Sequence, residues 1–241
     1  MRIAMWSGPR NVSTALMRSF GNRSDTHVVD EPLYAHYLKR TGLAHPGAAE
    51  VIAHHETDWR AVVRELCGPV PGGKRISYQK HMAHHLLPEI DRGWLTGLRH
   101  AFLIRDPVEM LPSLIRVFPS ADIEDTGLLQ QVEVFERVKR ERGVTPPVID
   151  ARDLLTDPRG MLGALCAALD VPFDESMLAW PPGPRDTDGI WARHWYDGVE
   201  RSSGFERWRA RTVELPESFQ PLYQRCLPPY EALHAVRLRT D

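Results

Sequence analysis

The chain has 241 residues, of which 42% are hydrophobic and 26% charged, with 30 Lys and Arg against 32 Asp and Glu. This is the composition of an ordinary globular protein, and it excludes collagen-like, disordered and disulfide-stapled chains. The formal charge of −2 also excludes the broad basic field of a general nucleic-acid binder, so any anion site must be local. Only four of the 30 cations are lysines, and they are Lys39, Lys74, Lys80 and Lys139.

The three cysteines, Cys67, Cys166 and Cys226, lie far apart and lack metal-binding spacing, which is typical of free thiols in a reducing compartment. We therefore expect a cytoplasmic protein. No apolar run approaches the roughly 20 residues that span a bilayer, so no membrane partner is expected. At this length we expect one domain, with an α/β core over 1–178 and a helical cap over 179–241. The sequence leaves open whether two copies form a homodimer.

Short runs rich in Ile, Val or Phe alternate with helical patterns over the first two thirds of the chain. This predicts an α/β fold with three layers, in which helices cover both faces of a parallel sheet of about five strands. The expected strands are Arg2–Trp6, His27–Val29, Arg75–Gln79, Ala101–Ile104 and Val148–Ala151. The expected helices are Ser13–Phe20, Ala48–Cys67, Val108–Phe118, Leu128–Arg142 and Pro158–Leu169. Ligands bind such sheets at the carboxyl ends of the strands, so residues just after each strand are candidate site residues.

The first expected strand leads into a tight loop and the start of a helix. Backbone N–H groups, two hydroxyls and a guanidinium there suit a phosphate or sulfate. The candidate ligands are Arg10, Asn11, Val12, Ser13 and Thr14. The Gly-Lys pair of ATP-hydrolysing P-loops is absent. A simple turn in which a hydroxyl caps the helix explains the same residues, and the loop alone does not decide between the two.

A second candidate anion site follows the strand that ends at Ile104. Arg105 leaves that strand at its carboxyl end, and Ser113 lies about two helical turns further on. Both can converge on one phosphate, because Arg gives a bidentate contact and Ser a directional hydroxyl. The alternative is an ion pair between Arg105 and Asp106 at a helix start.

The two segments together resemble the sulfotransferase superfamily, in which P-K-S-G-T-T holds the 5′-phosphosulfate of 3′-phosphoadenosine 5′-phosphosulfate (PAPS). A second family motif, R-D-P-x5-S, holds its 3′-phosphate. Residues 9–14 are Pro-Arg-Asn-Val-Ser-Thr, and Arg105-Asp106-Pro107 with Ser113 completes the second motif. A looser third match, residues 151–158, is similar to the family's E-D-L-x-x-D-P segment. The resemblance covers residues 2–178 and implies a P-loop-like sulfotransferase fold, PAPS as co-substrate, PAP as product and no metal.

This chain departs from the family pattern at two positions in the first motif. Arg10 stands where the family has Lys, and Val12 stands where it has Gly, which favours a different loop path around the sulfate. The family's C-terminal R-K-G-x-x-G-D-W segment has only a faint counterpart in residues 201–208.

Two residues are candidates for the base that removes the acceptor's proton. The segment 80–88 is similar to the family's K-T-H-L-P-x-x-L-L-P, in which the His is the general base, and alignment on its last three residues places His81 there. Glu31 follows the second expected strand, where some bacterial sulfotransferases have a Glu that acts as the base. A carboxylate there either needs a raised pKa or only orients the acceptor hydroxyl. Lys80 is expected to hold the bridging oxygen of the leaving group.

We therefore expect transfer of a sulfuryl group from PAPS to a hydroxyl of a small-molecule acceptor, with an amine as the second choice. Two alternatives remain. One is a noncatalytic PAP-binding module of the same fold, which the substitution at Val12 favours. The other is a kinase-like phosphoryl transferase, which the missing Gly-Lys pair and a site for a 3′-phosphate disfavour.

Overall fold

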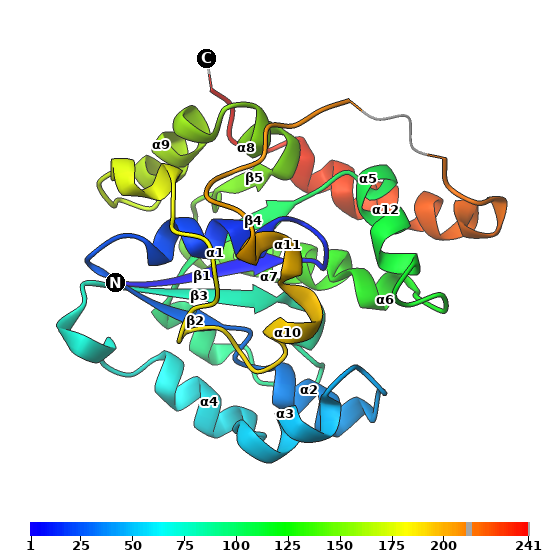
Figure 1. The fold of residues 1–241 in the computed structure, drawn as a ribbon, viewed down its shortest axis with the longest axis horizontal. Coiled ribbons are helices and arrows are strands. Elements are labelled where there is room, and N and C mark those ends of the chain that lie inside the picture. The colour runs from blue at the N-terminus through cyan, green and yellow to red at the C-terminus, as the bar shows by residue number, and fades with distance from the viewer. Residues whose placement is uncertain (211–213, 241) are drawn as a thin grey trace.

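A five-stranded parallel sheet forms the centre of the computed structural model, which describes residues 1–210 and 214–240. Its strand order is β2-β3-β1-β4-β5, and all neighbouring strands run parallel. Helices lie on both sides of the sheet (Figure 1). The predicted α/β class with three layers and about five strands is confirmed.

The elements follow the expected alternation, with strand bounds shifted by one to three residues. The strands are β1 (Arg2–Ser7), β2 (Thr26–Asp30), β3 (Ile76–Met82), β4 (Arg99–Ile104) and β5 (Val148–Asp150). The α-helices are α1 (Ser13–Gly21), α2 (Tyr34–Thr41), α3 (Ala48–His54), α4 (Trp59–Leu66), α5 (Pro107–Ile115), α6 (Ile123–Thr126), α7 (Leu128–Arg142), α8 (Ala151–Thr156), α9 (Pro158–Ala168), α10 (Ala192–Trp195), α11 (Asp197–Glu200) and α12 (Gln220–His234). The short 3-10 helix η2 (Ala83–His85) follows β3 directly.

Strand alternation divides the core into two layers. In β1, Ile3 and Met5 face the layer that contains α1, α2 and α9, whereas Ala4 and Trp6 face the layer that contains α5, α7 and α12. All four side chains are fully buried. Burial on both faces is what the continuous apolar runs predict for a parallel sheet, because each strand must be covered twice.

The helix expected over Ala48–Cys67 is wrong, because the chain forms two helices there. His55 has an extended backbone, with φ −117° and ψ 155°, which ends α3. Asp58 then begins α4, since its side chain accepts a hydrogen bond from the Arg60 N–H. A carboxylate that caps a new helix competes with continuation of the preceding one, so the apolar periodicity alone was misleading.

The helical C-terminal region expected from residue 179 has two parts. The segment with α10 and α11 lies near the carboxyl ends of β2 and β3, whereas α12 packs on the sheet beside α5 and α7 (Figure 1). Leu222, Cys226 and Leu233 of α12 are buried in that core layer. Residues 211–213 and 241 of this expected cap lie outside the described residues. None of the helices in the described part of the chain combines the length and the hydropathy that crossing a membrane requires.

The loop after β1 packs closely against the turn that joins α6 to α7. A methyl group on Gly8 would lie 2.3 Å from the carbonyl oxygen of Thr126, so this position has no room for a side chain. A methyl group on Gly127, which has φ 71°, would lie 3.5 Å from the Gly8 Cα. The loop that carries the first motif therefore lies directly against the turn at Thr126 and Gly127.

We expect Gly8→Ala to destabilise the fold by about 1–3 kcal/mol, because backbone on both sides would have to move. Urea unfolding of the purified protein measures this change. Gly163→Ala is the matched control, since a methyl group there meets nothing within 4 Å inside α9. It should stabilise the protein by about 0.5–1 kcal/mol. Equal effects of the two substitutions would contradict the proposed close approach.

Candidate active site

A cavity of about 310 Å³ opens at the carboxyl ends of β1, β2 and β3. Parallel sheets bind ligands at this edge, at the point where the chain after β1 and the chain after β4 turn in opposite directions along the sheet. Nine of the ten site residues expected from the sequence line this cavity. They are Arg10, Asn11, Val12, Ser13, Thr14, Glu31, Lys80, Arg105 and Ser113.

The loop between β1 and α1 has a strained backbone. Arg10 and Val12 have φ values of 61° and 59°, in the left-handed region that favours glycine. Val12 thus takes the backbone conformation that a Gly would adopt more readily in the same place, and for a β-branched residue this costs about 1–2 kcal/mol. Strain of this kind is typical of functional loops.

The N-terminus of α1 faces the cavity without a side-chain cap. The N-cap residue is Val12, and among the described residues no side chain caps this helix. Ser13 and Thr14, the first two residues of α1, therefore do not serve as capping residues, which was the simpler explanation of the loop. Their hydroxyls line the cavity beside the first N–H groups of a nine-residue helix, an arrangement that favours an anion.

Direct contacts join the two expected anion motifs. The Arg10 Nε donates to the Ser113 Oγ at 2.7 Å, and the Arg105 Nη1 donates to the Arg10 carbonyl at 2.9 Å. Burial lowers the pKa of Arg10, and the positive charges of Arg105 and Arg116 lower it further. Arg105 pairs with Glu109 at 3.3 Å, while Asp106 caps α5. The two motifs therefore form one concentrated positive region.

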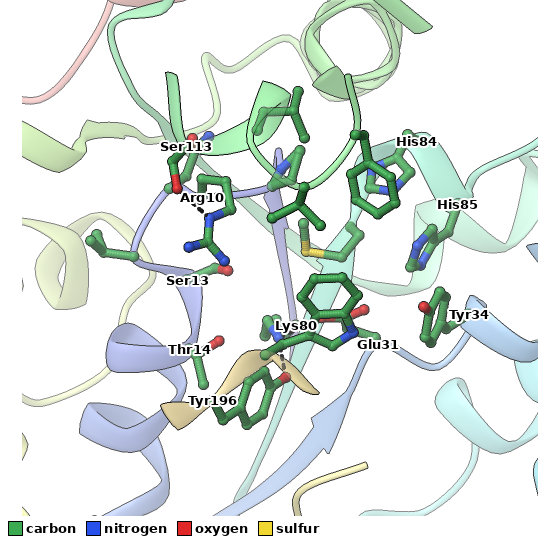
Figure 2. Close-up of a pocket in the computed structure, with 18 of the residues that line it drawn as sticks. Arg10, Ser13, Thr14, Glu31, Tyr34, Lys80, His84, His85, Ser113 and Tyr196 are labelled. Atoms are coloured by element: carbon green, nitrogen blue, oxygen red, sulfur yellow. Dashed lines mark hydrogen bonds and ion pairs between the residues drawn. The ribbon is translucent and has the colours of Figure 1, made fainter. Parts of the chain in front are cut away.

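Lys80 forms the centre of a buried polar cluster deeper in the cavity. Its Nζ donates to the Glu31 Oε1 at 2.7 Å and to the Tyr196 hydroxyl at 2.5 Å (Figure 2). It also donates to the Asp30 Oδ1 at 2.9 Å. The Tyr196 hydroxyl donates to the Asp30 Oδ2 at 2.7 Å. Only 1% of the Lys80 side chain is exposed. An ammonium this buried requires carboxylate partners, and two of them meet it here.

Glu31 is one of two carboxylates that share this cation, and its pKa is raised above its ordinary value. Burial is the largest cause and the charge of Asp30 adds to it, while Lys80 acts in the opposite direction. Burial by itself lowers the pKa of Lys80, but Asp30, Glu31 and Tyr196 outweigh it and hold that pKa well above its ordinary value. Glu31 also has a left-handed backbone, with φ 41°. The raised pKa that a basic Glu needs is therefore present.

Lys80 has three N–H donors, and Asp30, Glu31 and Tyr196 accept one each. In this arrangement none of its donors points to an empty part of the cavity. The role expected for Lys80 at the leaving group does not match these contacts. They fit a residue that fixes Glu31 and Asp30 instead.

The structure places His81 outside the cavity. β3 extends three residues beyond its expected end, so successive side chains from Lys80 to Met82 point to opposite faces of the sheet. His81 stacks on Trp6 with ring centroids 4.5 Å apart and contacts Gln79 in the opposite layer. Burial lowers its pKa to about 3. This placement contradicts the alignment of His81 with the family's base; Met82 occupies the face next to Lys80.

Sequence reasoning missed most of the cavity's aromatic end. These residues are Tyr34, His45, His84, His85, Phe118, Trp195 and Tyr196. They come from α2 and the loop after it, from η2, from the segment after α5, and from the end of α10 with the residue that follows it, so no single motif contains them. The pair His84-His85 beside the third strand was the visible signal. Among the described residues no group of three or more His, Cys, Asp or Glu side chains lies in metal-binding proximity.

Trp208, in the faint C-terminal match, contacts the second anion motif indirectly. Its indole Nε1 donates to the Glu109 Oε1 at 3.0 Å, and Glu109 pairs with Arg105. The Arg152 guanidinium lies 4.2 Å from the Trp208 ring centre. The segment around residue 208 is therefore linked to the positive region through one carboxylate.

A family model described as Sulfotransferase domain matches residues 1–237. The chain belongs to the sulfotransferase domain family. The predicted superfamily resemblance is thus confirmed over almost the whole chain, beyond the residues 2–178 that carried it. The family's chemistry is the transfer of sulfuryl groups.

Known proteins similar to this sulfotransferase domain include two from Arabidopsis thaliana. They are the branched-chain-amino-acid aminotransferase-like proteins 1 and 2, which are 39% and 37% identical over 233 and 231 residues. The alignments cover 97% and 96% of this chain and 41% of each relative, so the chain spans about two fifths of the curated relatives it matches. The solved sulfotransferase domain from the curacin biosynthetic pathway has a TM-score of 0.57 at 16% identity, covering 93% of this chain and 95% of that one. This likeness shows a shared fold.

We expect Lys80→Met in this sulfotransferase domain to lower the free energy of unfolding by about 3–5 kcal/mol, because it leaves buried carboxylates without a cation. The double variant Lys80→Met with Asp30→Asn should recover much of that loss, since it removes the uncompensated charge as well. Urea unfolding of the parent, both single variants and the double variant measures the coupling. Additive losses would contradict a shared ion pair.

Proposed function

We propose that this protein transfers a sulfuryl group from PAPS to the hydroxyl of a small acceptor, with an amine as the second choice of acceptor. The observation that carries the proposal is the division of one cavity. Arg10, Ser113 and the start of α1 form its anion-binding end, and Glu31 lies across from them toward Tyr34 (Figure 2). A donor and an acceptor bound at the two ends would meet beside a carboxylate whose pKa is raised.

At the donor end, Arg10, Asn11, Ser13 and Thr14 would hold the 5′-phosphosulfate, around the bend that Val12 makes. Arg105 and Ser113 would hold the 3′-phosphate. This assignment is supported by the contact between Arg10 and Ser113, which brings the two phosphate sites into one region. Arginine suits both roles, because its fork of donors matches phosphate and sulfate oxygens.

In the reaction, the bond between sulfur and the bridging oxygen of the 5′-phosphate breaks as a bond from sulfur to the acceptor oxygen forms. The electron pair of the broken bond stays on the phosphate of PAP. The acceptor's proton passes to the Glu31 carboxylate and later to solvent. Arg10 is the nearest cation to the developing phosphate charge in this scheme, and the N–H groups of α1 assist it.

Lys80 acts in this scheme as a positioning residue. It holds the Glu31 carboxylate at 2.7 Å and Asp30 at 2.9 Å, so both oxygens have fixed directions. Tyr196, the residue directly after α10, completes the cluster and links it to the cap. No metal takes part in the proposed chemistry.

A reducing, cytoplasmic setting fits the thiols. Cys67, Cys166 and Cys226 are unpaired, and Cys166 and Cys226 are buried. Burial raises the pKa of these two thiols to about 11, so they are poor nucleophiles near neutral pH. We propose no nucleic acid and no membrane as partners.

We expect PAP to bind the purified protein more tightly than ATP with magnesium, because the site has groups for a 3′-phosphate. Titration calorimetry compares the two nucleotides. Arg105→Ala should weaken PAP binding by at least about tenfold, since a charge-assisted contact is worth about 1.5–3 kcal/mol. Preference for ATP would support the kinase-like alternative and overturn the donor assignment.

Arg99→Ala is the matched control for this titration. Arg99 is half-exposed at the start of β4, at the opposite edge of the sheet, and its ion pair is with Asp170. Its loss should leave PAP affinity unchanged. If PAP binds but labelled sulfate from PAPS reaches no member of a diverse acceptor panel, the noncatalytic alternative is the correct one.

We expect Glu31→Gln to lower kcat by about 10²- to 10⁴-fold while PAP affinity stays the same. Asp30→Asn should move the acid limb of the pH-rate profile to lower pH. The sign follows from the cluster: without Asp30, Lys80 has Glu31 as its one carboxylate partner, so the pKa of Glu31 falls. The base is then ionised at a lower pH.

His81→Phe is the control for the base assignment, because a ring at this position still stacks on Trp6. It should keep kcat close to that of the parent protein. Loss of turnover in this variant together with full activity of Glu31→Gln would restore His81 as the base and exclude Glu31.

A further inference from the structure

Four rings form a continuous wall at the acceptor end of the cavity. They belong to Tyr34, His45, Phe118 and Trp195, and all four line the cavity. Neighbouring ring centroids lie 5.9 Å apart for Tyr34 and His45, 4.6 Å for His45 and Phe118, and 5.9 Å for Phe118 and Trp195. Each ring is inclined to the next, by 42°, 35° and 36°. The wall is therefore curved.

The imidazoles at this end are neutral. Burial lowers the pKa of His45, and it lowers that of His84 to about 3. Burial and the neighbouring histidines place the pKa of His85 well below its ordinary value. His85 lies against the rings of Tyr34 and Tyr37, with centroids 4.8 Å and 4.7 Å away. These rings provide π faces and no positive charge.

Negative charge is in excess next to the wall. Lys80 neutralises one of its two carboxylate neighbours, so Asp30 and Glu31 together leave one negative charge when Glu31 is ionised. Asp125 lines the adjoining cavity with His45 and acts on that ring. The remaining cations among the described residues that line the main cavity are Arg10 and Arg105. Both lie at the anion-binding end, and a donor with a 3′-phosphate and a phosphosulfate neutralises them.

An anionic acceptor is disfavoured by this field, and a neutral one gains nothing from it. An alkylated ammonium gains from both features, because aromatic faces attract cations and nearby carboxylates add to that attraction. We propose that the acceptor is a small alcohol carrying an alkylated ammonium group, which the rings of Tyr34, Phe118 and Trp195 bind while Glu31 contacts the hydroxyl. This inference rests on the proposed function and specifies its acceptor.

The arrangement fits one small molecule. Tyr34 and Glu31 lie on the same side of the cavity, away from Arg10 and Ser113 (Figure 2). The cavity of about 310 Å³ must also contain the reactive end of the donor, so the acceptor can have only a few carbon atoms. The Tyr34 hydroxyl is already bonded to the His45 Nδ1 at 2.9 Å, and His85 stacks on one face of the Tyr34 ring with centroids 4.8 Å apart, so the ring can offer only its other face to the acceptor.

The deciding experiment compares two acceptors of the same shape that differ in charge. Choline and 3,3-dimethylbutan-1-ol have the same arrangement of heavy atoms, with nitrogen replaced by carbon. With PAPS and the intact protein, kcat/KM should be at least about 5- to 30-fold higher for choline, from the strength of a desolvated cation–π contact. Phenol and 3-hydroxypropionate complete the panel, and both should be poorer acceptors than choline. Equal use of the two isosteres, or preference for phenol or the hydroxy acid, would overturn the inference.

A binding measurement keeps the inference separate from turnover. Tetramethylammonium chloride is titrated into the complex with PAP, against potassium chloride at equal ionic strength. Saturable binding of tetramethylammonium alone supports the cationic site. Failure of PAP to bind would instead contradict the proposed function itself, whereas bound PAP with no ammonium binding would contradict the acceptor inference alone.

Variants of the wall complete the test. Phe118→Leu and Trp195→Leu should each reduce the preference for choline over its neutral isostere by about 2- to 5-fold, because leucine retains apolar contact and loses the π face of one ring of the wall. Phe118→Tyr should retain the preference. Trp59→Leu, a half-buried tryptophan in α4 outside the cavity, is the matched control. PAP affinity of each variant reports whether the site is folded, and an unchanged preference in folded Trp195→Leu and Phe118→Leu proteins would overturn the inference.

Discussion

The buried ammonium of Lys80 is the constraint on which the site depends. A charge with 1% exposure requires compensation, and the compensating groups are Asp30 at the end of β2, Glu31 after it, and Tyr196 directly after α10. Asp30 also accepts the Gly189 N–H at 3.2 Å, and the neighbouring Asp188 pairs with the buried Arg18 of α1. The same cluster that fixes Glu31 therefore also holds the α10 segment over the sheet. The orientation of Glu31 and the position of the cap thus both depend on the buried Lys80 ammonium.

Strand alternation then decides which residues meet in the cavity. Lys80 and Met82 face one layer and His81 faces the other, and a one-residue shift would exchange these sets. The sequence alignment counted residues from a Leu-Leu-Pro segment beyond the strand and so selected His81. The side chains that face the cavity are found instead by counting alternate residues along β3 itself. Because β3 runs on to Met82, two adjacent residues such as Lys80 and His81 cannot both act on one ligand.

The sequence predicted the features that follow from local chemistry. The loop at Arg10 and the residue Arg105 follow strand ends directly, and Ser113 lies in the helix that begins after Arg105, so their convergence follows from the topology of a parallel sheet. It could not predict the partners that tertiary structure supplies. Tyr196 lies 116 positions from Lys80, and nothing near it in the chain indicates that its hydroxyl meets an ammonium. The division of the expected helix at His55 was likewise hidden, because apolar periodicity continues through the break.

Val12 shows how the fold tolerates a departure from its family motif. The loop has a left-handed backbone at Val12, the position where the motif has Gly, and the branched side chain packs at the edge of the core beside α1. Packing and the close approach at Gly8 hold the bend in place, so contacts elsewhere in the fold offset the free-energy cost of the strained backbone. A loop with a fixed bend presents Arg10 and the N-terminus of α1 in one orientation, and a preorganised positive region needs no rearrangement when an anion binds. The substitution that first suggested a noncatalytic protein is therefore compatible with an organised donor site.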